Sequence, residues 1–131
     1  HTQARRALQP VSGIGRILGL TLVLETGPIE RFAAVGNNAS YCRCVGSPHV
    51  SNGKQKGKGN TKNGNKYLAW AYVEAANFAV RYNPQIKRYY QRKRAKTKGV
   101  VAIKAVAHKL ARACYHILRD GSAFDVNRAF A

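Results

Sequence analysis

A serine stands at the head of a segment whose residue types suit phosphate chemistry. Ser51 is followed by four lysines with no acidic residue among them, namely Lys54, Lys56, Lys58 and Lys62. Glycines in the same segment let the backbone approach a surface that larger side chains would keep away. Ammonium groups together with free backbone N–H groups bind phosphate oxygens. The sequence therefore predicts a loop that contacts phosphates, with Ser51 as the candidate nucleophile.

The neighbouring cations are what make a serine plausible as a nucleophile toward phosphorus. In phosphoryl transfer, positioning and charge stabilisation supply most of the catalysis. Ser47, beside Pro48, is the competing serine. A serine in such a place can also serve only to turn the loop. Residues 46–64 can equally be a disordered surface linker rich in glycine and lysine.

Metal-dependent hydrolysis fits the sequence poorly. Two-metal nucleases need clustered carboxylates. The five acidic residues are scattered singly along the chain, as Glu25, Glu30, Glu74, Asp120 and Asp125. We therefore expect no metal or other cofactor bound by this chain itself.

The cysteines and histidines suggest two further kinds of site, a metal site and a hydrolytic triad, and both have weak support. Cys42, Cys44 and His49 could ligate a metal, but a one-residue gap between cysteines is not the usual zinc-finger spacing. Ser-His-Asp hydrolysis would need an acid and a nucleophile elbow beside His49 and Ser51, and neither is present. The three cysteines are more typical of reduced thiols in a cytosolic protein.

The composition indicates a single small domain with a polyanionic partner. With 131 residues, 45% of them hydrophobic, the chain can bury one compact core. Its net charge of +18 far exceeds what solubility requires and favours nucleic acid over an anionic membrane. No apolar run reaches the ~18 residues of a membrane span, and the amino end lacks the apolar core of a signal peptide. We therefore expect a cytoplasmic protein, and the absence of methionine suggests a fragment of a longer one.

Residues 10–15 resemble the turn of a helix-hairpin-helix element. The pattern places Gly13 and Gly15 around Ile14, directly before Arg16. Two glycines permit a sharp turn, and the N–H groups that open the following helix can hold a phosphate without reading base sequence. Gly13, Gly15 and Arg16 are therefore candidate nucleic-acid contacts. The alternative is a plain turn between two helices.

Hydrophobic periodicity predicts an all-α fold, with no alternation that would indicate a strand. The expected helices cover residues 2–9, 16–26, 39–44, 65–82, 84–96 and 100–120. The helix over 16–26 is apolar nearly all round, so we expect it to be central. In the helix over 65–82, Trp70, Val73 and Phe78 are expected to fill the remaining sides, and Glu74 to pair with a basic residue. Phe32 and Val35 are expected to close a small cluster, and Phe124 and Phe130 to fold the tail back.

The predicted helix over 84–96 is almost wholly basic. Its cations are Lys87, Arg88, Arg92, Lys93, Arg94 and Lys96, interleaved with Tyr89 and Tyr90. A solvated charged face usually mixes both signs, whereas this one has no acid, so we expect it to contact a phosphate backbone. Lys66, in the first turn of the preceding helix, extends the lysines of the loop, and the N-terminus of that helix adds to the same anion site.

Several short segments appear in an order that resembles a known family. They are residues 8–19, Arg31-Phe32, 41–46, Ser51, 61–65, 74–76, 107–111 and 118–120. Together they resemble the carboxy-terminal domain of the insertion-sequence "one-ten" transposases, which are relatives of the Piv DNA invertase. The similarity covers nearly the whole chain. Family members often have Ser-Gly where this chain has Ser51-Asn52-Gly53.

The resemblance implies a role in DNA recombination. In that family the serine becomes covalently linked to DNA, and it matches Ser51 here. An amino-terminal RuvC-like domain, absent from this chain, would contribute four acidic ligands for Mg²⁺. The partners implied are DNA at the ends and target of an insertion sequence, a structured bridge RNA that acts as guide, and further copies of the full-length protein.

The sequence thus predicts a single transposase domain in three parts. These are a helix-hairpin-helix-like part over 1–45, a flexible basic loop with the candidate nucleophile over 46–64, and a bundle of about three helices over 65–131. We expect the fragment by itself to be inactive in recombination. The alternative is a non-enzymatic module of the helix-hairpin-helix or ribosomal type, which would bind nucleic acid and be indifferent to Ser51.

Overall fold

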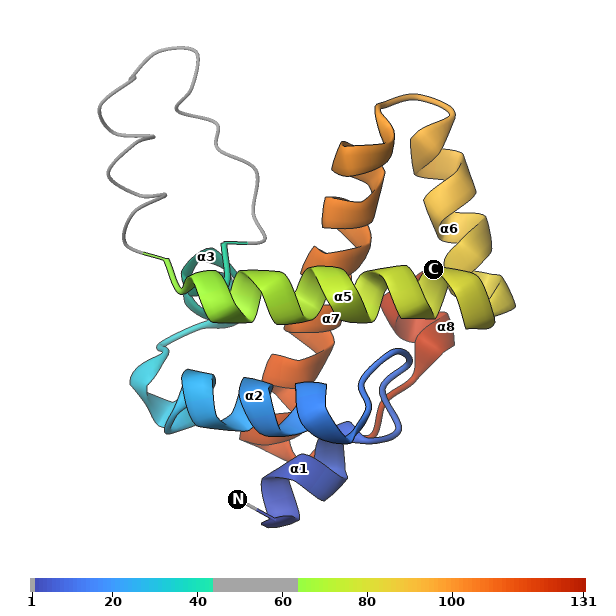
Figure 1. The fold of residues 1–131 in the computed structure, drawn as a ribbon. Coiled ribbons are helices and arrows are strands. Elements are labelled where there is room, and N and C mark those ends of the chain that lie inside the picture. Colours follow the sequence, from blue (N-terminus) through green and yellow to red (C-terminus); the bar gives the residue numbers. More distant parts are fainter. Residues whose placement is uncertain (1, 44–63) are drawn as a thin grey trace, which may run out of the picture.

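The computed structural model describes residues 2–43 and 64–131, and all the regular structure in these two ranges is helical (Figure 1). In chain order the helices are α1 (Thr2–Leu8), α2 (Arg16–Thr26), the 3-10 helix η1 (Ile29–Arg31), α3 (Val35–Tyr41), α5 (Lys66–Tyr82), α6 (Pro84–Arg94), α7 (Gly99–Asp120) and α8 (Val126–Ala129). The all-α prediction is confirmed. Within the same ranges no helix combines the length and apolar character that crossing a membrane requires.

Helix α7 is the element around which the fold is arranged. It packs against α1, α3, η1, α5, α6 and α8. Its buried side chains are Ala102, Val106, Ala107, Leu110, Ala111, Cys114, Tyr115 and Ile117. Small residues on α5, such as Ala71 and Ala75, are fully buried and let the two helices approach closely. Buried residues between 8 and 23 and between 68 and 130, together with Cys42, form this one core.

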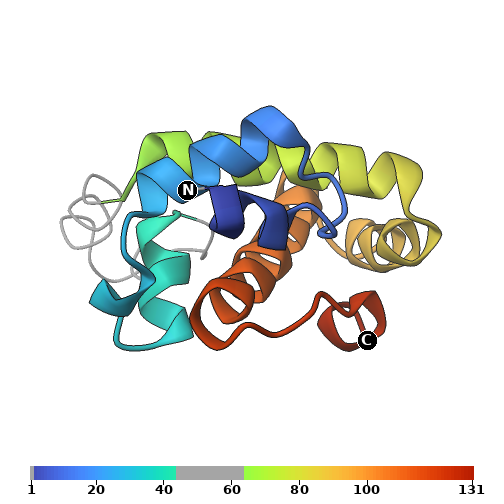
Figure 2. The ribbon, with the colours of Figure 1, turned by 90° about the horizontal axis from the view of Figure 1, so that it is seen from below.

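Helices α2 and α5 run side by side along one side of α7 (Figures 1 and 2). Leu18, Leu22 and Val23 of α2 are buried, but Ile17 is 77% exposed. Leu20 and Leu24 are exposed as well. The expectation that α2 is central was therefore wrong, because within the described part of the chain it is covered on one side only.

Two aromatic residues of α5 are exposed for the same reason. Trp70 and Phe78, which were expected to fill the other sides of the helix, are both exposed, whereas Val73 is half-buried. The expected ion pair of Glu74 is also not found among the described residues. The periodicity identified the helix correctly but did not show which of its sides are covered.

Helices α6 and α7 form an antiparallel hairpin, joined through residues 95–98 (Figure 1). α6 ends at Arg94, two residues before the predicted end. Ile86 and Tyr89 are its buried residues, and the Tyr89 ring meets Phe130 edge-on with 5.3 Å between ring centres. Phe130 is buried, so the tail does fold back on the helices.

The short helix α8 was not predicted. Asp125 begins it by accepting hydrogen bonds from the backbone N–H groups of Asn127 and Arg128, at 3.0 and 3.3 Å. An aspartate in this position is a common helix N-cap, so the signal was present in the sequence. The four residues of α8 are too few to show periodicity.

Helix α3 begins four residues and ends three residues earlier than the predicted helix over 39–44. It covers Val35–Tyr41, and the chain leaves the helical conformation at Arg43, whose φ is +59°. Phe32 and Val35 form the expected small cluster with Ile29 and Tyr115. The Phe32 carbonyl oxygen accepts hydrogen bonds from the Tyr115 hydroxyl and from Arg119, which attach this segment to α7.

Candidate nucleic-acid interface

The turn between α1 and α2 is held firmly against α5. Val11 and Ile14 are buried, and backbone hydrogen bonds join Val11 to Leu8 at 3.0 Å and Ile14 to Val11 at 3.1 Å. Gly13 has φ +87°, and a Cβ atom there would overlap the carbonyl group of Ala75. Only glycine adopts this positive φ without strain and also lacks the Cβ atom that would clash. Gly13 is therefore required for packing of the turn, and its predicted contact with nucleic acid stays a prediction.

Gly15 and Arg16, in contrast, lie open at the N-terminus of α2. No atom lies within 4 Å of the position that a Cβ of Gly15 would take. Gly15 is extended, and no side chain caps the N-terminus of α2. The first N–H groups of a helix have no partner within it, so a phosphate oxygen could accept from them beside the Arg16 guanidinium.

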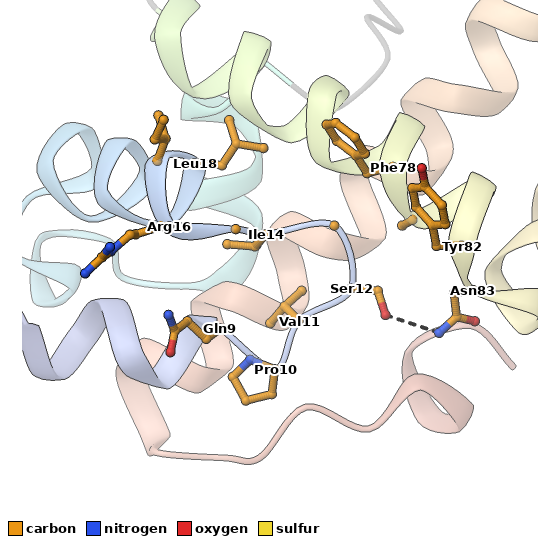
Figure 3. A pocket seen from close by; sticks show the side chains of 14 residues that line it. Gln9, Pro10, Val11, Ser12, Ile14, Arg16, Leu18, Phe78, Tyr82 and Asn83 are labelled. Carbon is orange, nitrogen blue, oxygen red and sulfur yellow. Dashed lines mark hydrogen bonds between the residues drawn. The ribbon is translucent and has the colours of Figure 1, made fainter.

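A groove of about 700 Å³ runs between this turn and the end of α5 (Figure 3). Phe78 and Tyr82 of α5 line it opposite Gly15 and Arg16. Their rings are stacked, with 6.4 Å between centres and 14° between planes. The groove therefore combines an open backbone, a cation and an exposed aromatic pair.

Asn83 connects this groove to the basic helix α6. Its side-chain Nδ2 donates to the Ser12 hydroxyl at 3.1 Å (Figure 3), and its Oδ1 accepts from the N–H groups of Gln85 and Ile86, both at 3.0 Å. Asparagine before proline is a common start of a helix, whereas no local pattern indicates the bond to Ser12, 71 positions away. One side chain thus sets the start of α6 relative to the turn.

The cations of α6 lie together on the surface of the molecule. Lys87, Arg88, Arg92, Lys93, Arg94 and Lys96 are all exposed, the last just beyond the helix end. The ion pair found within the described ranges joins His116 to Asp120, at the far end of α7. The positive charge of α6 is therefore not neutralised by neighbouring acids.

Helix α7 adds a cation that the sequence did not identify as part of this surface. The Nζ of Lys109 lies 5.6 Å from the centre of the Tyr89 ring, and Arg92 and Lys93 of α6 each lie 5.7 Å from it. Desolvation of the buried ring raises the pKa of the Tyr89 hydroxyl, which Arg92 opposes. Three cations from two helices thus surround one aromatic ring.

His108 lies in the same positively charged environment. Its pKa is lowered first by desolvation and then by the charges of Arg112 and Lys109. His108 is half-buried, whereas Lys104 and Arg112, one turn away on either side, are exposed. The positive surface therefore continues from α6 onto α7.

The segment that carries the candidate nucleophile lies outside the described residues. Ser51, Lys54, Lys56, Lys58 and Lys62 belong to it, as do the competing Ser47 and the possible metal ligands Cys44 and His49. Cys42, the remaining possible ligand, is buried. Lys66 is described: it is exposed in the first turn of α5, with its Nζ 5.3 Å from the Tyr67 ring centre.

The two ends of this segment are joined by Asn65. Its backbone N–H donates to the Tyr41 carbonyl oxygen at 2.7 Å, and its side chain donates to Glu25 at 3.0 Å and to the Tyr41 hydroxyl at 3.3 Å. The hydrogen bond from Asn65, followed by the Arg31 guanidinium, lowers the pKa of Tyr41. A Cβ atom at Gly64 would overlap the Arg43 side chain, so a larger residue there would force the arginine to move.

The predicted contacts therefore fall into two regions. Gly15, Arg16 and the α6 cations lie near the C-terminal end of α5, whereas Lys66 lies at its N-terminal end. The 17 residues of α5 span about 25 Å at the rise of an α-helix. A nucleic acid that touches both regions must follow most of the length of this helix.

Comparison with known protein families places the chain beside a family of transposases. The family model described as "Transposase IS116/IS110/IS902 family" matches residues 5–91, about two thirds of the 131 residues. The match begins in α1 and ends in α6, so α7 and α8 lie beyond it. No curated protein matches the chain.

Proposed function

The chain belongs to the IS116/IS110/IS902 transposase family, and on that premise we propose that it binds the DNA of an insertion sequence and supplies Ser51 as the nucleophile of strand exchange. The family match carries the proposal, because it covers Ser51, the turn before α2 and most of α6. The unneutralised charge of α6 supports the DNA-binding part independently.

Binding would rest on phosphate contacts. Arg88 and Arg92 on α6 and Lys109 on α7 are cations without acidic neighbours, and Gly15 with Arg16 offers backbone N–H groups and a guanidinium. Contacts of this kind fix the position of a duplex but carry no sequence information. This chain would thus hold DNA firmly, while the choice of sequence would come from elsewhere.

The chemical step would be attack of the Ser51 oxygen on a phosphorus atom of the DNA. A P–O bond to serine forms as the bond to the leaving strand oxygen breaks. The serine loses its proton, and the leaving oxygen gains one. Lys54 and Lys56, close in sequence, would stabilise the negative charge on the phosphate.

Mg²⁺, if the reaction uses it, would be held by residues outside this chain. All five acidic residues lie in the described ranges, and in those ranges no three His, Cys, Asp or Glu residues gather into a metal site. We propose that a RuvC-like domain brings the carboxylates. A guide RNA would supply base pairing, and its phosphates suit the α6 surface as DNA phosphates do.

The decisive test is Ser51→Ala in a full-length recombinase that contains this chain. We expect DNA affinity to stay unchanged, while recombination and the covalent protein–DNA adduct are both lost. Ser47→Ala serves as the matched control and should retain both. If the Ser51→Ala protein still recombines DNA, the nucleophile assignment is wrong. A non-enzymatic binding module would form no adduct in any variant.

A further inference from the structure

We infer that the tip of the α6–α7 hairpin is a wedge that enters duplex DNA and unstacks a base step. The tip consists of residues 94–101, which cover the end of α6, the connector and the first turn of α7. Its exposed valines are Val100 and Val101. The inference rests on the DNA binding proposed above, and it adds what that binding does to the duplex.

The two valines of the tip lie where no neighbouring element covers them. Val100 is 80% exposed, the largest fraction among the large apolar side chains of the described residues, and Val101 is 51% exposed. The buried stripe of α7 begins only after them, at Ala102. The hairpin carries the valines to its free end, beyond α5 (Figure 1). Two apolar side chains in this place contribute little to the core, so they are available to a partner.

Hydrogen bonds hold the connector of the tip in place. The Thr97 hydroxyl donates to the Lys93 carbonyl oxygen at 2.8 Å, and the Thr97 N–H donates to the same oxygen at 3.0 Å. The Arg94 guanidinium donates to the Thr97 carbonyl oxygen at 3.2 Å. Arg94 and the Tyr90 hydroxyl also lie against Gly99, the first residue of α7. A preformed tip loses little conformational freedom on binding, which favours a wedge over a flexible loop.

The surroundings of the valines are strongly positive. The exposed cations nearest in sequence are Arg94, Lys96, Lys98 and Lys104. Residues 84–112 contain ten basic residues and no acidic one. The combination of apolar side chains and surrounding cations fits a partner with an anionic surface and an apolar interior. Duplex DNA has this character, because its phosphates lie outside and its stacked bases lie inside.

The width of the hairpin decides which part of it can enter DNA. The axes of two packed helices lie about 8–10 Å apart, and each helix with its side chains is about 10–12 Å across. The pair is therefore wider than the major groove, at about 12 Å, and much wider than the minor groove, at about 6 Å. Only the tip can enter a groove, while the cations along α6 reach the flanking phosphates. Apolar side chains that enter DNA in this way separate base steps and kink the duplex.

A membrane surface fits the tip less well than DNA does. Helices that bind at a membrane surface bury a long apolar face in the lipid. The apolar face of α7 is instead buried against the other helices of the fold. The tip itself offers two valines, which are too few to anchor the chain in lipid.

The test measures, by fluorescence anisotropy, the affinity of the chain for two short DNA duplexes that differ by one central mismatch. A wedge works against base stacking, which a mismatch has already weakened, so the wild-type chain should bind the mismatched duplex about fivefold to twentyfold more tightly. Permanganate, which oxidises unstacked thymines, should react with the paired duplex only when the chain is bound. Val100→Gln with Val101→Gln should lose both the preference and the thymine reactivity. Its salt dependence should stay unchanged, because its cations are unchanged.

The matched control is Val100→Ile with Val101→Ile, which keeps apolar side chains at both positions and should retain the preference and the reactivity. Both variants should keep the wild-type circular dichroism spectrum, since the two side chains are exposed. A wild-type chain that binds DNA with neither the preference nor the reactivity overturns the inference and leaves the proposed DNA binding intact. A chain that binds neither duplex overturns both. Binding to phosphatidylglycerol vesicles that weakens in the glutamine variant, with unchanged DNA results, would assign the tip to a lipid surface instead.

Discussion

Asn65 donates its backbone N–H to the carbonyl oxygen of Tyr41 at 2.7 Å, which closes the chain across residues 44–63. The Asn65 side chain also caps α5 through the N–H groups of Tyr67 and Leu68, and it reaches Glu25 on α2. One residue therefore joins α3, α2 and α5 at the base of the segment that contains Ser51.

Replacement of Asn65 should destabilise the fold. Asn65→Ala removes a helix cap and two donated hydrogen bonds, so we expect the free energy of unfolding to fall by about 2–3 kcal/mol. Asn65→Asp keeps the cap but places a second carboxylate beside Glu25, and an intermediate loss is expected. Urea denaturation measures the free energy of unfolding of both variants. Asn77→Ala, whose side chain donates only to the Val73 carbonyl, should change stability by less than about 0.5 kcal/mol.

The two glycines of the α1–α2 turn should respond differently to alanine. Gly13→Ala forces a Cβ against Ala75 at a positive φ, and we expect a loss of about 2–4 kcal/mol. Gly15→Ala has open space around it and should cost no more than about 1 kcal/mol. If Gly15 contacts a phosphate, that variant should bind DNA roughly threefold to tenfold more weakly. Equal loss of stability in both variants would contradict this distinction.

Neutralising Lys109 should weaken DNA binding as much as neutralising a cation of α6. For Lys109→Gln and for Arg92→Gln, the slope of log K against log salt should fall by about 0.9 per lost phosphate contact. Arg6→Gln makes the same change of charge at an exposed position of α1, which packs on α2 and α7, and should leave the slope almost unchanged. Fluorescence anisotropy over a salt series provides the comparison. An unaltered slope in the Lys109 variant would remove α7 from the interface.

Acid should destabilise the protein through His108. Because its pKa is lowered in the folded state, the unfolded chain binds more protons as the pH falls below 6.5, the ordinary value for histidine. The stabilisation from a neutral His108 is therefore complete above that pH and is lost as the pH falls through the folded pKa. Between about pH 7.5 and about pH 5.5, His108→Gln should lose less stability than the wild-type chain. Thermal unfolding at these two pH values measures the difference. An equal loss of stability in His108→Gln and in the wild-type chain over this interval would contradict the assignment.

The helices themselves could be read from local patterns. Such patterns are the apolar spacing over 65–82 and 100–120 and the Asn83-Pro84 cap. Each of them involves residues within one or two turns of each other. α3 was misplaced because its end depends on the left-handed Arg43 and on contacts of Phe32 with α7. Those determinants are not local, so periodicity could not reveal them.

By itself the sequence determined the helical class, the excess of positive charge and the presence of cations without acids on α6, because each follows from residue types and short spacings. Only the tertiary structure decided which apolar residues are covered, since Ile17 and Leu18 are equivalent by type but opposite in exposure. It also decided that Lys109 joins the α6 cations and that Asn83 reaches Ser12. These relationships depend on how helices distant in the chain pack around α7, which no short segment of the sequence encodes.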